Sequence, residues 1–458
     1  MPLAPPIWRC GWFLSITRAE EGVGLRPYLD ELRVHWRPLT GAFVGLSGGL
    51  MMASYVMGIM APYLIGEFGW PKSQFALVSG LGLVSILVFP VVGRLTDLVG
   101  VRRAAMVGAV SAPLLFLAST QLHDLRTYAI LYTLQCFLLV TTTPPVYCRA
   151  VVQHIKHARG LALGIVMSGP ALTYAIGGSF LNNFVAAHGW RAGYLALAVF
   201  TTITGVVAML LLPAGRKKDE PKKVRHKSAK EDYRKIFRSR AFWIIAFGVL
   251  LCTLPQSVMM TQLSLVLAAN GAAGAAASAI LSVFATGILL GRFLSGLALD
   301  RFSSRIVAAV GQALSAVGLF IFASGLSARP MLMLAALLFG LTAGAEGDVM
   351  AYLVVRNFGV RIYSSVAGII AAAVAIAAVI GFVSLSVMLE AFGSFSPFLT
   401  MAGVLVLIGS VIFLFLPANP EVVDVVEESS AEESSAEESR GEENSVPPAA
   451  RVRDGTAG

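Results

Sequence analysis

Twelve apolar stretches, each long enough to cross a lipid bilayer, constrain the fold of this chain more than any other feature. A transmembrane helix needs about 20 mostly apolar residues, because its backbone groups must find their hydrogen bonds inside the segment. With 56% hydrophobic and only 13% charged residues, the chain is predicted to be an all-α polytopic membrane protein. The stretches occupy residues 40–65, 73–93, 104–121, 127–149, 160–184, 191–213, 241–268, 272–296, 306–325, 330–354, 364–389 and 395–417.

The stretches fall into two sets of six. The basic linker between the sets contains a possible amphipathic helix around residues 230–237 and could bind anionic lipid heads or nucleic acid, although a topology signal explains it better. The acidic tail is too poor in apolar residues to fold and is expected to be disordered. The predicted units are a cytoplasmic arm (1–38), a first six-helix bundle (39–213), the linker (214–240), a second six-helix bundle (241–417) and the tail (418–458).

The net charge of +9 follows the predicted topology. Loops on one side of the twelve-span layout contain only Lys72, Arg126, Arg191 and Arg329, and the other basic residues lie on the opposite side or in the tails. Because Lys and Arg concentrate in cytoplasmic loops, both termini are predicted to be cytoplasmic. We expect a multi-pass protein of a bacterial inner (plasma) membrane, in contact with membrane lipid and without a nucleic-acid partner.

Motifs of enzymes and cofactor sites are missing from the sequence. It contains no GxxxxGK[ST] loop for nucleotide phosphates and no HExxH, CxxC or GxSxG motif. The four cysteines, Cys10, Cys136, Cys148 and Cys252, lack the spacing of metal ligands. We therefore expect no enzyme activity, no cofactor and no metal.

A short polar motif recurs in the two halves. It reads GRLTDLVGVRR from Gly93 and GLALDRFSSR from Gly296. Glycine allows helices to approach closely, aspartate suits a helix N-terminus, and arginine stays in water. The repeat therefore predicts a helix–loop–helix corner in each of two related halves. Three pairs of residues are each 203 positions apart: Gly93 and Gly296, Asp97 and Asp300, and Arg102 and Arg305.

The first copy resembles the G-x-L-x-D-x-x-G-x-R-R loop between helices 2 and 3 of the major facilitator superfamily; in the second copy Ser303 replaces the later glycine. The resemblance covers roughly residues 38–417 and implies two pseudo-symmetric six-helix bundles that transport by alternating access. It also implies that Asp97 approaches Ser364 and Ser365, and that Asp300 approaches Arg159 and Gly160. The implied gating residues are Gly93, Asp97, Arg102, Arg103, Gly296, Asp300, Arg305 and Arg149.

Charged residues inside the apolar stretches are costly and are therefore functional candidates. Arg292 carries a planar guanidinium fork that fits a carboxylate. Its segment, ATGILLGRFLSGLALD, resembles helix 8 of the monocarboxylate transporters and the oxalate–formate antiporter-like group, which implies that Arg292 binds the substrate carboxylate. Ile288 stands where animal members have an acid, and the lysine of helices 1 and 11 is absent. A snorkelling arginine or a structural partner of Asp300 is the alternative.

Glu346 and Asp348 are two positions apart and therefore point about 200° apart on a helix. One is expected to face the cavity and carry a proton, and the other to pair with Arg149 or Arg356; structural ion pairing of both is an equal alternative. Tyr55 and Gln256 are further candidates for substrate contact, because they lie deep in their apolar stretches.

These features predict a secondary active transporter of a small organic anion, a mono- or dicarboxylate, driven by proton symport or anion exchange. The alternative within the superfamily is an exporter of lipophilic or drug-like compounds, which Gly169 followed by Pro170 favours slightly. A receptor or scaffold would need a folded cytoplasmic module, for which the linker and the tail are too short and too polar.

Overall fold

A computed structural model of the protein describes residues 25–70, 78, 81–213, 229–272 and 275–417. All of them belong to one compact unit, Met1–Pro420, and within these ranges the chain forms helices and loops but no strand. The acidic tail, most of the basic linker and the first part of the arm lie outside the described residues, so the predicted domain boundaries there stay predictions.

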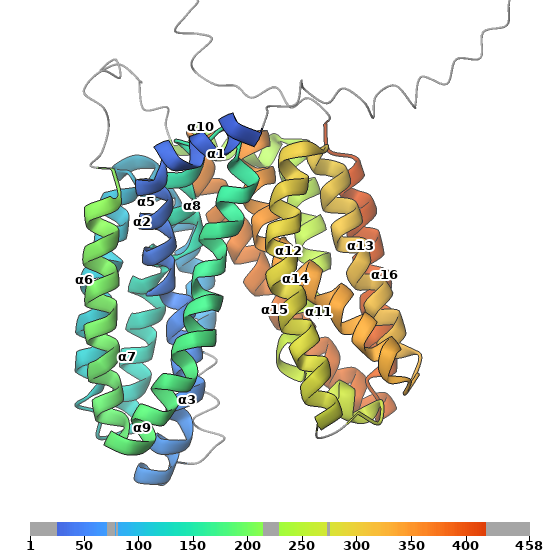
Figure 1. The fold of residues 1–458 in the computed structure, drawn as a ribbon, viewed down its shortest axis with the longest axis horizontal. Coiled ribbons are helices and arrows are strands. Elements are labelled where there is room, and N and C mark those ends of the chain that lie inside the picture. Colours follow the sequence, from blue (N-terminus) through green and yellow to red (C-terminus); the bar gives the residue numbers. More distant parts are fainter. Residues whose placement is uncertain (1–24, 71–77, 79–80, 214–228, 273–274, 418–458) are drawn as a thin grey trace, which may run out of the picture. The chain divides into compact units, whose positions relative to one another are not determined.

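The described helices follow the chain as two sets, each preceded by a short helix (Figure 1). The short helices are α1 (Leu25–Val34) and α10 (Ala229–Arg238). The first set comprises α2 (Trp36–Ser47), α3 (Leu50–Phe68), η1 (Leu81–Val84), α5 (Ser85–Val99), α6 (Val101–Ser119), α7 (Leu125–Leu138), η2 (Leu139–Thr142), α8 (Pro144–Val152) and α9 (Arg159–Leu211). The second set comprises α11 (Arg240–Ala269), α12 (Ala275–Arg301), α13 (Ser304–Ala323), α14 (Arg329–Phe358), α15 (Tyr363–Phe392) and α16 (Ser396–Leu414).

Among the described residues, ten helical segments are long and apolar enough to cross a membrane, and they correspond to the third to twelfth predicted spans. The first predicted span is built from α2 with α3, and the described part of the second is built from η1 with α5. The single helix α9 carries two spans, because Gly189 has a positive φ of 84° and changes the direction of the chain there. The architecture is therefore the predicted one of twelve helices in two bundles.

Two predicted spans are interrupted where they meet. The sequence predicts continuous helices over residues 40–65 and 127–149, but the first breaks at Gly48 and Gly49, and the other turns through η2 before two prolines. The backbone N–H of Leu50 donates to Oγ1 of Thr142 at 3.0 Å. A Cβ at Gly49 would lie only 2.5 Å from that oxygen. The second break therefore supplies an acceptor for a backbone N–H freed by the first, as an irregular backbone inside a membrane requires.

The buried core shows which parts of the two bundles pack together. One cluster of buried side chains runs from α2, α5, α8 and the start of α9 into the second bundle. A separate cluster, which includes Met60, Phe116 and Tyr194, lies within the first bundle and belongs to the other end of its helices. The bundles therefore pack against each other at the end that carries the repeated motif, which we call the corner-loop end.

Both corner aspartates lie inside helices, not at the start of one as the motif suggests. Asp97 is in the last turn of α5, which ends before Gly100 with a φ of 88°, and Asp300 is in the last turn of α12. Each carboxylate instead reaches the N-terminus of a helix in the other bundle, as described below.

Candidate functional site

Arg292 and Asp348 form an ion pair between α12 and α14. Arg292 Nη1 lies 3.6 Å from Asp348 Oδ1, which is too long for a hydrogen bond, and the side chains are 15% and 0% exposed. Arg292 Nε and Nη1 and both oxygens of Asp348 lack a hydrogen-bond partner within the described residues. Arg292 is therefore not the partner of Asp300, and its pair with Asp348 is incompletely satisfied.

Glycines bring α12 and α14 close enough for this pair to form. A Cβ at Gly287 would lie 2.9 Å from the carbonyl oxygen of Leu337, and a Cβ at Gly344 would collide with the carbonyl oxygen of Ile288. Helix α9 of the first bundle covers the pair, since a Cβ at Gly164 would lie 2.9 Å from the carbonyl oxygen of Arg292 and 3.5 Å from Asp348 Oδ2. The pair thus lies where the two bundles meet.

Glu346 points to a different helix from Asp348. Its carboxyl group accepts a hydrogen bond from Thr253 Oγ1 of α11. The predicted divergence of the two acids is therefore present. The predicted partners are wrong, however: within the described residues Asp348 pairs with Arg292, Glu346 pairs with no cation, and Arg149 pairs with Asp97. The register of α14 turns Asp348 toward α12, a relation between helices that spacing along one helix does not contain.

The two weaker candidates for substrate contact do not join this pair. Gln256 is 7% exposed on α11 and makes no hydrogen bond or ion pair to Arg292 in the described structure. Tyr55 lies in α3, but its side chain is outside the described residues.

Asp97 closes the first corner contact. Its carboxylate accepts the backbone N–H groups of Ser364 and Ser365, at 3.1 and 2.6 Å, and the hydroxyl of Ser365 at 2.5 Å. It also forms an ion pair with Arg149 of α8, and both side chains are buried. Because a carboxylate at a helix N-terminus satisfies free N–H groups and the helix dipole, Asp97 links α5 to α15 of the other bundle.

Asp300 closes the second corner contact. It accepts the N–H groups of Gly160 at 2.6 Å and Leu161 at 3.1 Å, one residue later than the sequence predicts. The hydroxyl of Tyr28 supplies a third hydrogen bond, at 2.6 Å. No arginine pairs with Asp300 within the described residues. The two corners are therefore related but not identical.

The other motif residues divide into packing positions and free arginines. A Cβ at Gly93 would collide with the carbonyl oxygen of Ser364, and one at Gly296 would lie 2.8 Å from the carbonyl oxygen of Gly160, so both positions need glycine. Three arginines begin the helices after the corners and make no ion pair within the described residues: Arg102, Arg103 and Arg305.

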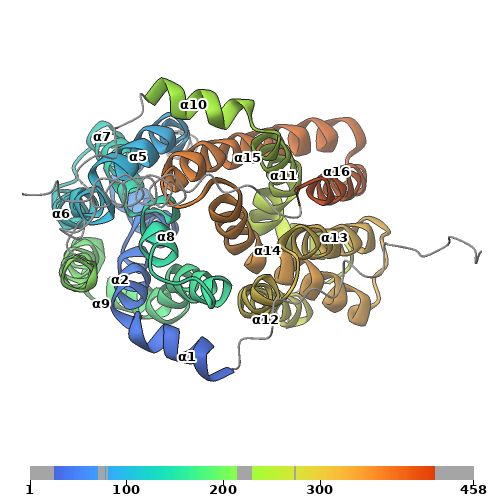
Figure 2. The ribbon, with the colours of Figure 1, turned by 90° about the horizontal axis from the view of Figure 1, so that it is seen from above.

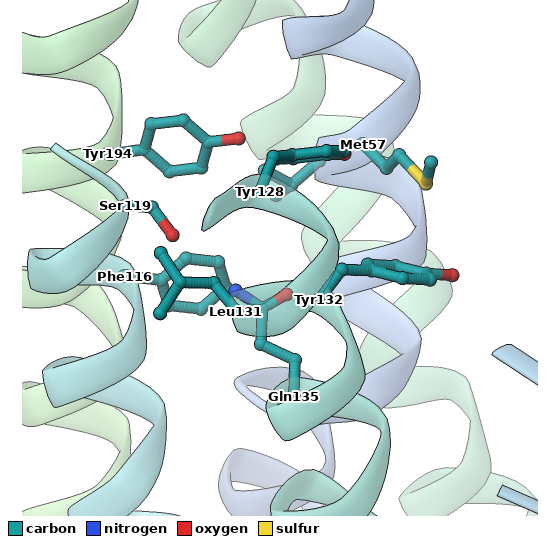
Figure 3. A pocket seen from close by; sticks show the side chains of 9 residues that line it. Met57, Phe116, Ser119, Tyr128, Leu131, Tyr132, Gln135 and Tyr194 are labelled. Atoms are coloured by element: carbon teal, nitrogen blue, oxygen red, sulfur yellow. The ribbon is translucent and has the colours of Figure 1, made fainter. Parts of the chain in front are cut away.

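A small pocket lies inside the first bundle, among aromatic side chains (Figure 3). Tyr128, Tyr132, Tyr194, Phe116 and Gln135 contribute to its lining. Its volume of about 10 Å³ is room for about one water molecule. It is therefore too small for a carboxylate substrate.

Sequence reasoning missed several residues of the corner-loop end. Asp232 of α10 pairs with Arg94 and Arg361, and Glu31 of α1 accepts backbone N–H groups before α9. Tyr28 contacts Asp300, as noted above. The available signal was amphipathic character near 230–237, which marks a surface helix but not its partners.

Comparisons with known proteins agree with this architecture. The chain is 27% identical over 394 residues to human monocarboxylate transporter 11, covering 83% of each protein. Its structure is similar to that of the E. coli fucose:proton symporter, with a TM-score of 0.64 and 14% identity over 84% of this chain and 98% of that one. A bacterial homologue of the iron transporter ferroportin in an outward-facing state gives a TM-score of 0.65 and 16% identity over 84% and 99%.

The family itself is identified by two matches, one for each bundle and its flanks, over residues 42–269 and 245–448. Together with the twelve-helix fold and the paired corner motifs, they show that this multi-pass membrane protein belongs to the Major Facilitator Superfamily of transporters.

Proposed function

We propose that the chain carries a small organic anion, a mono- or dicarboxylate, and that Arg292 holds the carboxylate. The observation that supports this most is the buried guanidinium of Arg292, whose Nε and Nη1 have no hydrogen-bond partner within the described residues. A carboxylate would accept a two-pronged pair of N–H groups along one edge of the guanidinium, from Nη1 with Nη2 or from Nε with Nη2, and would so satisfy one of these atoms. The similarity to a monocarboxylate transporter favours the same class of substrate.

Asp348 competes with the substrate for Arg292. When a substrate carboxylate takes the guanidinium, Asp348 is left buried without its cation, which is an expensive arrangement. A proton on Asp348 removes that cost, so substrate and proton move together in a symport cycle. In exchange of one anion for another, a carboxylate occupies Arg292 on both strokes, so Asp348 keeps its proton throughout and no proton crosses with the substrate.

The corner contacts hold the structure closed at the corner-loop end. Substrate released on that side would have to pass the contacts of Asp97 and Asp300, which join each bundle to a helix N-terminus of the other. Breaking both contacts is the step that alternating access requires there.

The corner-loop end is proposed to face the cytoplasm, with both termini on that side, because basic loop residues concentrate there. The predicted bacterial plasma membrane stays a prediction, since the curated relative is human.

Uptake of radiolabelled carboxylates into proteoliposomes tests the proposal. Wild type is expected to accumulate a mono- or dicarboxylate, and to do so faster with an inward proton gradient if symport operates. The uptake rate of Arg292→Gln is expected to be at least 100-fold lower, since a two-pronged, charge-assisted contact contributes roughly 3 kcal/mol or more. Arg191→Gln is the matched control, because Arg191 pairs with Glu67 on the surface, where both side chains are nearly half exposed.

Normal uptake by folded Arg292→Gln would contradict the proposal. Export of lipophilic compounds would then become the leading hypothesis. Loss of uptake in Arg191→Gln as well would show that removing any arginine impairs the protein, and the result for Arg292→Gln would then no longer support a specific role of Arg292.

A further inference from the structure

Helices α1 and α10 occupy equivalent places in the two halves of the chain. Helix α1 precedes the first bundle and α10 precedes the second, and Figure 2 shows them on opposite rims of the corner-loop end. Neither belongs to a membrane span. Each carries polar side chains that contact both bundles at that end.

Asp232 of α10 joins both bundles. It lies 2.7 Å from Arg94 of α5, in the first bundle, and 2.8 Å from Arg361, which precedes α15 in the second bundle. The Asp232 side chain is only 3% exposed. Burial alone would raise the pKa of its carboxyl group, but the hydrogen bonds and charges of Arg361 and Arg94 outweigh burial and hold the pKa below its ordinary value.

Tyr28 and Glu31 of α1 also join both bundles. Tyr28 donates to Asp300 of α12, in the second bundle, at 2.6 Å. Glu31 accepts three backbone N–H groups of the first bundle just before α9, from Lys156 at 2.7 Å and from His157 and Ala158 at 2.9 Å. Burial would raise the pKa of Glu31, but these N–H groups outweigh it and keep the pKa low.

The two sets of contacts have the same crossed pattern. Each surface helix contacts the corner helix of the opposite bundle: α1 reaches α12 through Tyr28, and α10 reaches α5 through Asp232. Each also contacts its own bundle just before a helix that a corner aspartate caps. Helix α1 contacts residues 156–158, before α9, and α10 contacts Arg361, before α15. Both corner contacts are therefore flanked by a helix that is bonded to both sides of the joint.

We propose that α1 and α10 are a symmetric pair of braces that favour the closed corner-loop end, with Tyr28, Glu31 and Asp232 as their positioning residues. The two bundles cannot separate at this end while the braces keep their bonds to both. The braces act on the equilibrium between conformations and touch no part of the Arg292–Asp348 pair. Their effect is independent of which anion is carried.

Distances between spin labels on the full-length protein, in lipid nanodiscs without substrate, test this proposal. One label pair at Gln153 and Phe302 reports the corner-loop end, and another at His123 and Leu326 reports the opposite end; all four positions are exposed. The labels are placed in a background in which Cys10, Cys136, Cys148 and Cys252 are replaced by alanine.

Asp232→Asn is expected to raise the ratio of open to closed corner-loop ends about tenfold, because it weakens two charge-assisted contacts, and Tyr28→Phe about threefold, because it removes one hydrogen bond. The opposite end should close in proportion. Tyr28→Phe removes only a hydroxyl group, so it keeps the test decisive if the Asp232 variant does not fold. Asp30→Asn is the matched control for α1, since Asp30 is exposed on that helix and makes no hydrogen bond or ion pair within the described residues.

Unchanged distance distributions in folded Tyr28→Phe and Asp232→Asn would overturn the proposal, even if their thermal stability fell. An equal shift in Asp30→Asn would overturn it too, because the effect would then come from α1 charge in general. Neither result bears on carboxylate uptake, so the braces and the substrate proposal fail separately.

Discussion

Asp97 and Asp348 are both almost completely buried, at 2% and 0% side-chain exposure, and each pairs with an arginine that is mostly buried, yet their surroundings differ. Asp97 pairs with Arg149 and also accepts two backbone N–H groups and a hydroxyl. Asp348 has only Arg292, at 3.6 Å, and neither of its oxygens accepts a hydrogen bond from the described residues.

We propose that this difference separates a structural contact from a binding site. A buried charge stabilises a conformation only when its hydrogen-bonding capacity is filled, and an incompletely paired charge stays available to another partner. The corner contact therefore suits the task of holding one conformation. The Arg292–Asp348 pair suits a site that exchanges Asp348 for a substrate carboxylate.

The largest expected effect comes from breaking the filled contact. Asp97→Asn leaves Arg149 buried without its carboxylate and weakens the cap of α15, so we expect it to destabilise the closed state by about 4 kcal/mol. Spin-label distances at the corner-loop end and unfolding in detergent measure this. A cost below that of Asp300→Asn, which removes no ion pair, would contradict the ranking of the two corners.

Added volume at the second corner should also open it. A Cβ at Gly160 would lie 2.8 Å from Asp300 Oδ1 and would collide with the carbonyl oxygen of Gly296, so Gly160→Ala is expected to cost the closed state about 2 kcal/mol. Gly311→Ala in α13 is the matched control, since its Cβ would meet nothing within 4 Å. Equal distance distributions in the two variants would show that the close approach at Gly160 is not needed.

A smaller loss of stability is expected at the incomplete pair. Asp348→Asn removes a carboxylate that makes no hydrogen bond to Arg292, and the Arg292 side chain stays 15% exposed to solvent. Leaving its charge unpaired should therefore cost less than at the more buried Arg149, and we expect about 1 kcal/mol, well below the cost of Asp97→Asn. Unfolding of both variants in the same detergent gives the comparison. A cost at Asp348 equal to or above that at Asp97 would mean that the Arg292–Asp348 pair is a structural contact.

The smallest effect concerns pH and the surface helices. The pKa values of Glu31 and Asp232 are held below their ordinary range, so these carboxylates stabilise the closed state above about pH 4 and lose that effect only as pH falls through the lowered values. These two groups should therefore leave the fraction of closed corner-loop ends unchanged between pH 8 and pH 5. A decline between pH 7 and pH 6 that Asp232→Asn abolishes would contradict this assignment.

The structural features that could be predicted from sequence are those that depend on a single continuous segment of the chain. Apolar length predicted the spans, and the repeated motif predicted the related halves. The resemblance of the motif to the superfamily implied the approach of Asp97 to the start of α15. The partners of Asp232, Thr253 and Asp348 depend on how helices are placed against each other. Between α12 and α14, that placement includes a close approach at Gly287 and Gly344. The break at Gly48 and Gly49 escaped prediction because glycine is also common in continuous membrane helices.

The most direct test of the central claim is the number of protons taken up when a carboxylate binds to the purified protein in weakly buffered detergent solution. If the substrate displaces Asp348 from Arg292, wild type should take up close to one proton for each carboxylate bound, Asp348→Asn should bind without proton uptake, and Arg292→Gln should not bind measurably. Undiminished proton uptake in Asp348→Asn, or normal binding in Arg292→Gln, would contradict the account.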